Sequence, residues 1–235
     1  MRILCLQHID YAGPGILPTY ADEHGHSFEV FPVWEVDTFP DIYSFDFLII
    51  LGGPFSVNDL ERFAWMQREV DFIQRAIECK KLIFGISFGS QLLSKILGAD
   101  VYPIRTREIG WFPIKLEKDF YESVAVPRDK NHLNVMHWHG EAFTLPEGAR
   151  LLAHNTLTRN QWFLWENHVM GIQFHLEHTP ESTQQMIDHR FLEFTPENRT
   201  DFVQTPYKIL SQRRLFAYSN RFLYLILDWY TAQAV

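Results

Sequence analysis

The sequence has few cysteines, no excess of positive charge and no long hydrophobic run. Its two cysteines, Cys5 and Cys79, are too few for a disulfide framework. Both lie in or beside expected buried elements, so we interpret them as reduced core thiols of a cytoplasmic protein. The formal net charge of −8 argues against general binding to nucleic acid or to a membrane surface, because phosphate contacts need a basic face.

The sequence shows no sign of a membrane span or of a secretory leader. The apolar stretch 222–227 is far shorter than the roughly 20 residues that a membrane-spanning helix requires. The N-terminal residues lead directly into an expected strand and lack the charged start and apolar core of a signal peptide. We therefore expect neither a membrane anchor nor export.

The composition is that of a globular protein with one substantial core. Hydrophobic residues make up 46% and charged residues 21% of the 235 residues. No internal repeat, low-complexity tract or linker rich in glycine and serine divides the chain. We expect a single domain over residues 1–235.

Apolar runs suited to buried strands alternate with helical patterns over the first hundred residues. The expected strands span residues 2–6, 27–33, 47–51 and 82–84, and the expected helices span residues 16–24, 64–80 and a segment that ends near Gly98. This alternation predicts an α/β fold, with a doubly wound, mostly parallel sheet and helices on both faces. Ligand sites in such sheets gather at the carboxyl ends of the strands.

The pattern changes after Gly98. Short strand-like pieces follow at residues 101–104, 111–116, 134–138, 151–154, 161–165 and 169–174. Pro180 suits the first position of a helix that Thr179 caps. We expect residues 179–232 to form a C-terminal helical extension of two or three helices, broken near Pro196 and Pro206.

One turn between a strand and a helix has the pattern of a nucleophile elbow. The segment Gly85-x-Ser87-x-Gly89 joins the strand at 82–84 to a helix whose apolar face carries Leu92 and Leu93. Glycines there allow a sharp turn and close packing, so the central side chain projects at the edge of the sheet. Backbone N–H groups at the start of the helix favour developing negative charge. The other interpretation is a tight turn with an incidental serine.

A second group of residues supports the catalytic interpretation. His175 and Glu177 lie two apart at the end of an apolar strand, so both can project to one side. An imidazole held by a carboxylate is a general base, which is what a nucleophile on an elbow needs. If His175 is taken alone, the simpler interpretation is a structural histidine that caps a backbone group at the end of the strand.

With these motifs in place, the sequence resembles the class I glutamine amidotransferase domains, close to the one that feeds ammonia to GMP synthase. Within that group it is similar to stand-alone amidotransferase-like proteins. A further stretch, residues 136–140, also fits the family. The motifs that match, in order, are Gly52-Gly53-Pro54, Gly85-Ile86-Ser87-Phe88-Gly89-Ser90-Gln91, Glu108-Ile109-Gly110-Trp111 and Gly171-Ile172-Gln173-Phe174-His175-x-Glu177.

The resemblance implies a flavodoxin-like fold, a site without a cofactor or metal, and hydrolysis of the glutamine side-chain amide through a covalent glutamyl-enzyme. It also implies a role for each matching residue. The catalytic triad maps to Ser87, His175 and Glu177, the oxyanion hole to the N–H groups of Gly53 and Phe88, and substrate binding to Gly52, Gln91, His137, Trp138 and His139. The expected partners are glutamine or a γ-glutamyl compound, a separate synthetase subunit that accepts ammonia, and a second copy in a homodimer.

Ser87 departs from the family, in which the nucleophile is cysteine. A thiol loses its proton readily beside a histidine and a helix N-terminus, whereas an alcohol has no accessible anion. Three explanations follow: an engineered replacement that silences or weakens the enzyme or traps a substrate, a natural serine peptidase or amidase with a Ser-His-Glu triad, or a relative that binds without turnover.

Other residues have simpler interpretations. The histidines at 137, 139, 175 and 178 have spacings that can bind zinc, but the triad already accounts for His175. We interpret Arg105, Arg107 and Glu108 as a solvated loop or a subunit contact. The C-terminal aromatic residues are expected to lie in the core or on a dimer face, and they are Phe222, Tyr224, Trp229 and Tyr230.

Overall fold

The computed structural model describes residues 1–36, 38–124 and 131–233. Its strands are β1 (Arg2–Gln7), β2 (Ser27–Pro32), β3 (Phe47–Ile50), β4 (Leu82–Ile86), β5 (Val101–Leu116), β6 (His132–Phe143), β7 (Arg150–His154), β8 (Trp162–Trp165) and β9 (Val169–Ile172). Its helices are α1 (Leu17–Glu23), η1 (Val57–Arg62), α2 (Ala64–Glu78), α3 (Phe88–Ile96), α4 (Lys118–Ser123), α5 (Pro180–His189), η2 (Phe191–Phe194), η3 (Pro196–Asn198), α6 (Pro206–Leu210) and α7 (Arg213–Thr231).

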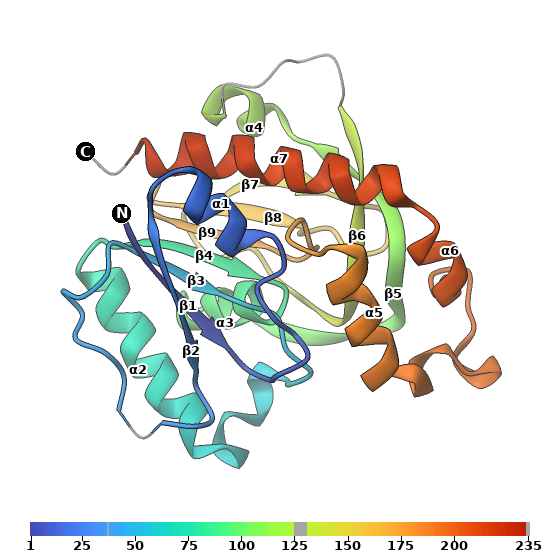
Figure 1. Ribbon diagram of the computed structural model, residues 1–235, viewed down its shortest axis with the longest axis horizontal. Helices are drawn as coiled ribbons and strands as arrows, with labels where there is room; N and C mark the ends of the chain where they lie inside the picture. The colour runs from blue at the N-terminus through green and yellow to red at the C-terminus, as the bar shows by residue number, and fades with distance from the viewer. Residues whose placement is uncertain (37, 125–130, 234–235) are drawn as a thin grey trace.

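All nine of these strands join one sheet, in the order β2-β1-β3-β4-β9-β8-β7-β5-β6 (Figure 1). The pairs from β2 through β9 are parallel, and the pairs from β9 through β6 are antiparallel. Strands β3, β4 and β9 are buried along their whole length, as a parallel sheet covered on both faces requires. The predicted α/β fold is confirmed, and about half of the sheet is its parallel part.

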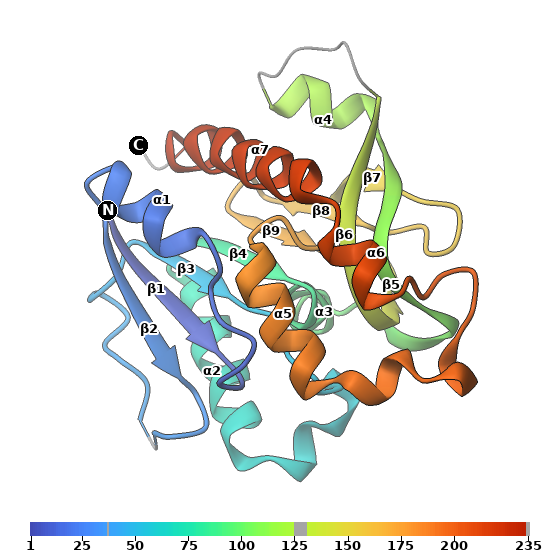
Figure 2. The ribbon, with the colours of Figure 1, turned by 45° about the vertical axis from the view of Figure 1, so that its right-hand side comes forward.

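Helices cover both faces of the parallel part (Figures 1 and 2). Apolar side chains of α1 and α7 pack with β1, β3 and β4 in one core cluster. Side chains of α2 and α3, among them Met66 and Leu92, pack on the opposite face in a second cluster. The predicted core role of the C-terminal aromatics is confirmed for Phe222 and Tyr230, which are buried in the first cluster.

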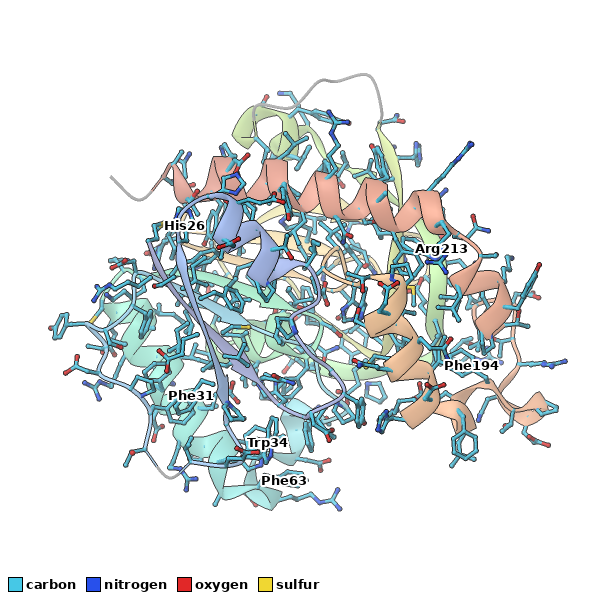
Figure 3. All side chains as sticks on the ribbon, in the orientation of Figure 1. His26, Phe31, Trp34, Phe63, Phe194 and Arg213 are labelled. Carbon is cyan, nitrogen blue, oxygen red and sulfur yellow. The ribbon has the colours of Figure 1, made fainter. Side chains whose placement is uncertain are left out.

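The C-terminal extension begins as predicted and then folds beside the antiparallel strands. Thr179 caps α5 in a reciprocal capping box, with Pro180 at the first position of the helix. Helices α5, α6 and α7 contribute Ile187, Ile209 and Phe216 to a third apolar cluster against β5 and β6. Figure 3 labels Phe194, near the end of α5, and Arg213, where α7 starts. Within the described ranges, no helix is both long enough and apolar enough to cross a membrane.

Two expectations are wrong. The segment that contains Arg105, Arg107 and Glu108 is no loop, because β5 and β6 form one long antiparallel ribbon with a shift of register between Pro103 and Glu108. The alternation of charged residues there reflects a strand with one solvated face, and Glu108 points to the buried one. Cys79 is exposed, because it lies at the C-terminal end of α2, beyond the face that packs on the sheet.

Candidate active site

Ser87 lies at the turn between β4 and α3 in a strained backbone conformation. Its φ of 53° and ψ of −111° are unusual for a residue with a side chain, and such strain costs on the order of 1–3 kcal/mol. The turn is held by the N–H of Ser87, which donates to the carbonyl of Ile172 in β9 at 2.8 Å, and by the hydroxyl of Ser90, which donates to the carbonyl of Ser87 at 2.7 Å. The strain is that of a nucleophile elbow.

The two glycines of the elbow make close packing possible. A Cβ added to Gly89 would lie 2.2 Å from the carbonyl oxygen of Ile50 in β3, and one added to Gly85 would lie 2.6 Å from the carbonyl oxygen of Gly89. Both distances are far inside van der Waals contact. The start of α3 therefore rests directly on the backbone of two neighbouring strands.

His175 and Glu177 meet as the sequence predicts. The Nδ1 of His175 lies 2.6 Å from Oε1 of Glu177, and the N–H of Leu176 donates to the other carboxylate oxygen at 3.0 Å. Because the carboxylate accepts the Nδ1 proton, the Nε2 of His175 is left with a free lone pair, and within the described part of the chain this buried atom has no hydrogen-bond partner.

Ser87 and His175 both lie next to Gly52, in the loop that follows β3. A Cβ built on Gly52 would lie 3.8 Å from Oγ of Ser87 and 3.2 Å from Cε1 of His175. All three residues line one cavity of about 300 Å³. The geometry therefore brings the alcohol, the imidazole and the carboxylate together at the carboxyl ends of β3, β4 and β9.

The carboxylate of Glu177 remains ionised. Burial alone would raise the pKa of Glu177, but the attraction of His175 and His178 outweighs burial and lowers it to about 2. His178 also faces the carboxylate, with Nε2 at 3.8 Å from Oε1, and burial lowers the pKa of His178 to about 4. Glu177 is thus a fixed negative charge behind His175 at neutral pH.

Nearly all of the residues expected at the site line this cavity. The predicted residues that line it are Gly52, Gly53, Ser87, Phe88, Gln91, Trp138, His139, His175 and Glu177. His137 is the exception, because its side chain is fully buried and does not line the cavity. Neither the N–H of Gly53 nor that of Phe88 has a hydrogen-bond partner among the described residues.

Several charged residues of the cavity were missed in the sequence. Arg107 in β5 and Arg190 after α5 both form ion pairs with Oε1 of Glu193, the first at 2.8 Å. The indole of Trp138 donates to the other oxygen of Glu193 at 2.6 Å. Glu193 therefore holds both guanidinium groups, and Glu141 is a further acidic residue of the cavity lining. No motif signals the group, since its members come from three distant segments.

A second buried polar cluster lies beside the cavity, on the β5–β6 ribbon. Glu108 is paired with His139 across the ribbon, with Nε2 of His139 at 3.1 Å from Oε2 of Glu108, and His137 lies next to them. Asn155 and Thr158 also donate to this carboxylate, at 2.7 and 2.8 Å. Glu108, His137 and His139 each offer one ligand atom and could together hold a metal ion. His175, Glu177 and His178 form a second such group. In both groups the carboxylate already has protein hydrogen-bond donors, so we assign no metal.

We expect the stability of the protein to fall steeply in mild acid. Burial lowers the pKa of His137 to about 3 and that of His178 to about 4, against 6.5 in the unfolded chain. The unfolded state therefore binds more protons below pH 6.5, and each histidine should lower the free energy of unfolding by about 2 kcal/mol between pH 7 and pH 5. Urea titrations at pH 7, 6 and 5 measure this loss. A constant free energy over that range would contradict it.

Comparison with known proteins identifies the family of this chain. The family model of glutamine amidotransferase class-I matches residues 17–194. The glutamine amidotransferase-like protein YfeJ of Salmonella typhimurium is 27% identical over 209 residues, which cover 87% of each chain. Gamma-glutamyl peptidase 5 of Arabidopsis thaliana is 30% identical over 177 residues, which cover 71% of this chain and 68% of the peptidase.

Further similarity extends to part of a synthase and to a solved structure. One subunit of the glutamine-hydrolysing GMP synthase of Sulfurisphaera tokodaii is 30% identical over 136 residues, 57% of this chain and 68% of the relative. The crystal structure of a glutamine amidotransferase from Methylobacillus flagellatus superposes with a TM-score of 0.90 at 23% identity, over 98% of this chain and 94% of the other, and so shares the fold. Because the model of the family matches most of the length of this chain, the chain belongs to the class I glutamine amidotransferase family.

Proposed function

We propose that this protein hydrolyses a γ-glutamyl amide, with Ser87 as the nucleophile, His175 as the general base and Glu177 as the group that orients the imidazole. The observation that carries the proposal is the unpartnered Nε2 of His175, buried beside the elbow serine while Nδ1 is held by a carboxylate. A base that is oriented on one nitrogen and free on the other is ready to accept the proton of an attacking hydroxyl.

The reaction runs in two steps. Oγ of Ser87 bonds to the γ-carbonyl carbon while Nε2 of His175 takes the hydroxyl proton, and the carbonyl oxygen becomes an oxyanion. The unpartnered N–H groups of Gly53 and Phe88 stabilise this charge. When the C–N bond breaks, His175 returns the proton to the leaving nitrogen, which departs as ammonia or an amine. Water then cleaves the glutamyl ester by the same route and restores Ser87.

Serine makes this enzyme slower than a cysteine relative. The hydroxyl has to lose its proton during attack, whereas a thiol beside a histidine and a helix N-terminus is largely ionised beforehand. Oγ is also closer to its own Cβ than Sγ would be, so the attacking atom lies farther from the carbonyl carbon. We therefore propose slow turnover, limited by the formation of the glutamyl ester.

The arginines of the cavity favour a substrate with an additional carboxylate. Arg107 and Arg190 share one carboxylate, Glu193, and each guanidinium has five N–H donors, more than this contact uses. A γ-glutamyl peptide presents such a carboxylate on its leaving group, and the similarity to gamma-glutamyl peptidase 5 supports this substrate class. For the hydrolysis of glutamine itself, the similarity to a component of GMP synthase supports a separate synthetase chain that accepts the ammonia.

Covalent trapping tests the proposal without requiring turnover. The glutamine analogue 6-diazo-5-oxo-norleucine should form an adduct on the peptide that contains residue 87, because its terminal carbon bonds to the nucleophile as nitrogen is lost. Peptide mass spectrometry should show the adduct in the native protein, none in Ser87→Ala, and an unchanged adduct in Ser94→Ala, a buried serine outside the cavity. Binding of glutamine without any adduct would instead identify a relative that binds but does not react.

A further inference from the structure

A fully buried ion pair lies beneath the loop that follows β3. His8, directly after β1, and Glu69, in α2, both have no exposed side-chain surface, and Nε2 of His8 lies 2.9 Å from Oε1 of Glu69. The second oxygen of Glu69 is buried without a partner among the described residues. A buried pair of this kind adds little stability over apolar residues of the same size, and a buried oxygen without a partner costs free energy. Stability alone therefore gives a weak reason for the pair.

The second ring nitrogen of His8, Nδ1, contacts the backbone of the candidate oxyanion hole. Nδ1 of His8 lies 3.3 Å from the carbonyl oxygen of Gly52. In a trans peptide the carbonyl and the following N–H point in opposite directions, so this hydrogen bond directs the N–H of Gly53 away from His8. Gly52 itself lies against the site, because a Cβ on it would come within 3.2 Å of His175 and 3.4 Å of Ser87. The hydrogen bond thus sets the direction of an oxyanion donor.

The two ring nitrogens of His8 have different partners. A carbonyl oxygen only accepts, so in the hydrogen bond to Gly52 the donor is Nδ1 of His8. Glu69 holds the ring from its other side, at Nε2. A ring that is held at both nitrogens cannot rotate without losing one of the two contacts.

The ring of His8 is also fixed by its neighbours. It packs edge-on against Phe88, with ring centroids 4.8 Å apart, and lies 5.9 Å from the ring of Trp65. A Cβ on Gly53 would come within 3.1 Å of Cβ of His8. His8 therefore touches both of the residues whose N–H groups form the expected oxyanion hole.

We propose that His8, held by Glu69, is a positioning residue that fixes the Gly52–Gly53 peptide with its N–H directed at the developing oxyanion. The inference rests on the proposed function. Since loss of one oxyanion donor costs about 10²–10³ in kcat, partial loss of its orientation should cost about 10–10²-fold.

Two substitutions separate the two contacts of the ring. In His8→Asn the side-chain nitrogen occupies the place of Nδ1 and can still donate to Gly52, whereas in His8→Gln it occupies the place of Nε2 and reaches only Glu69. Both are made in the Ser87→Cys background, where we expect faster turnover. The matched control is His154→Gln, which removes a histidine that lies 2.6 Å from Glu117 and is not part of the cavity lining.

The expected result is a loss of kcat without a loss of reactivity at residue 87. For γ-glutamyl-p-nitroanilide, His8→Gln should lower kcat by about 10–10²-fold with KM unchanged, His8→Asn should stay within about threefold, and His154→Gln should match the parent. Alkylation of the introduced thiol at position 87 by iodoacetamide forms no oxyanion, so its rate should be equal in all of them. Equal kcat in the two His8 variants, or slower alkylation that parallels the loss of kcat, would overturn the proposal.

A second readout does not depend on activity. In the native Ser87 protein, the amide ¹⁵N resonance of Gly53 should differ between His8→Gln and His8→Asn, because both lose the ring and only one keeps the hydrogen bond. A difference there supports the positioning role even if no substrate is hydrolysed, and identical resonances refute it. If His8→Gln does not fold, the double variant His8→Leu/Glu69→Met removes both polar partners and should show the same loss of kcat.

Discussion

Replacing Ser87 with cysteine is expected to raise the rate of γ-glutamyl amide hydrolysis by about 10³-fold, within the 10⁶-fold or so that loss of a nucleophile costs in other triads. Residue 87 lies between the imidazole of His175 and the N-terminus of α3, and both stabilise a thiolate but leave an alcohol protonated. The remaining cavity residues stay in place, so the substitution changes only the nucleophile.

Ammonia release from glutamine and product release from γ-glutamylglycine measure this gain and compare the two substrate classes. Faster hydrolysis of the peptide would place its carboxylate near Arg107 and Arg190, and faster hydrolysis of glutamine would favour supply of ammonia to a synthetase. Ser87→Ala is the control and should be inactive towards both. A folded cysteine variant that hydrolyses neither compound would contradict the proposed function.

The elbow could be predicted from sequence because its determinants are local. An apolar strand, two glycines four residues apart and an apolar helical face define the turn within about a dozen residues around Ser87. His175 and Glu177 are only two residues apart, so their contact could also be predicted without knowledge of the tertiary structure. The order of the parallel strands then brings these two segments to one edge of the sheet.

The charged wall and the buried pairs could not be predicted in this way. Arg107 and Glu193 are 86 positions apart, and their contact depends on how η2 folds back over the β5–β6 ribbon. The environment of Glu108 follows from the register of that ribbon, which opposes it to His139, and a shift of register near Pro103 is invisible in a periodic pattern. His8 shows no local signal, since its two partners come from the loop after β3 and from α2.

Replacing Gly89 with alanine is expected to destabilise the protein by about 3 kcal/mol or more. The added Cβ would lie 2.2 Å from the carbonyl oxygen of Ile50 and 2.8 Å from its carbonyl carbon. These are backbone atoms of a buried central strand, so no side-chain rotation can relieve the overlap, and α3 has to move away from β3. Because Ser87 is at the start of α3, that movement would also separate it from the β3 loop.

Gly13→Ala is the matched control, since its added Cβ would meet only the amide nitrogen of Gln7, at 3.9 Å. It should change the free energy of unfolding by no more than about 0.5 kcal/mol. Urea denaturation of both variants at pH 7 measures the difference. Equal stabilities would mean that α3 does not rest on the backbone of β3, and the close approach that directs Ser87 into the cavity would lose its explanation. A large loss in Gly89→Ala alone would show that the packing of helix on strand requires glycine at this position of the elbow, and that the position of the nucleophile is a consequence of that packing.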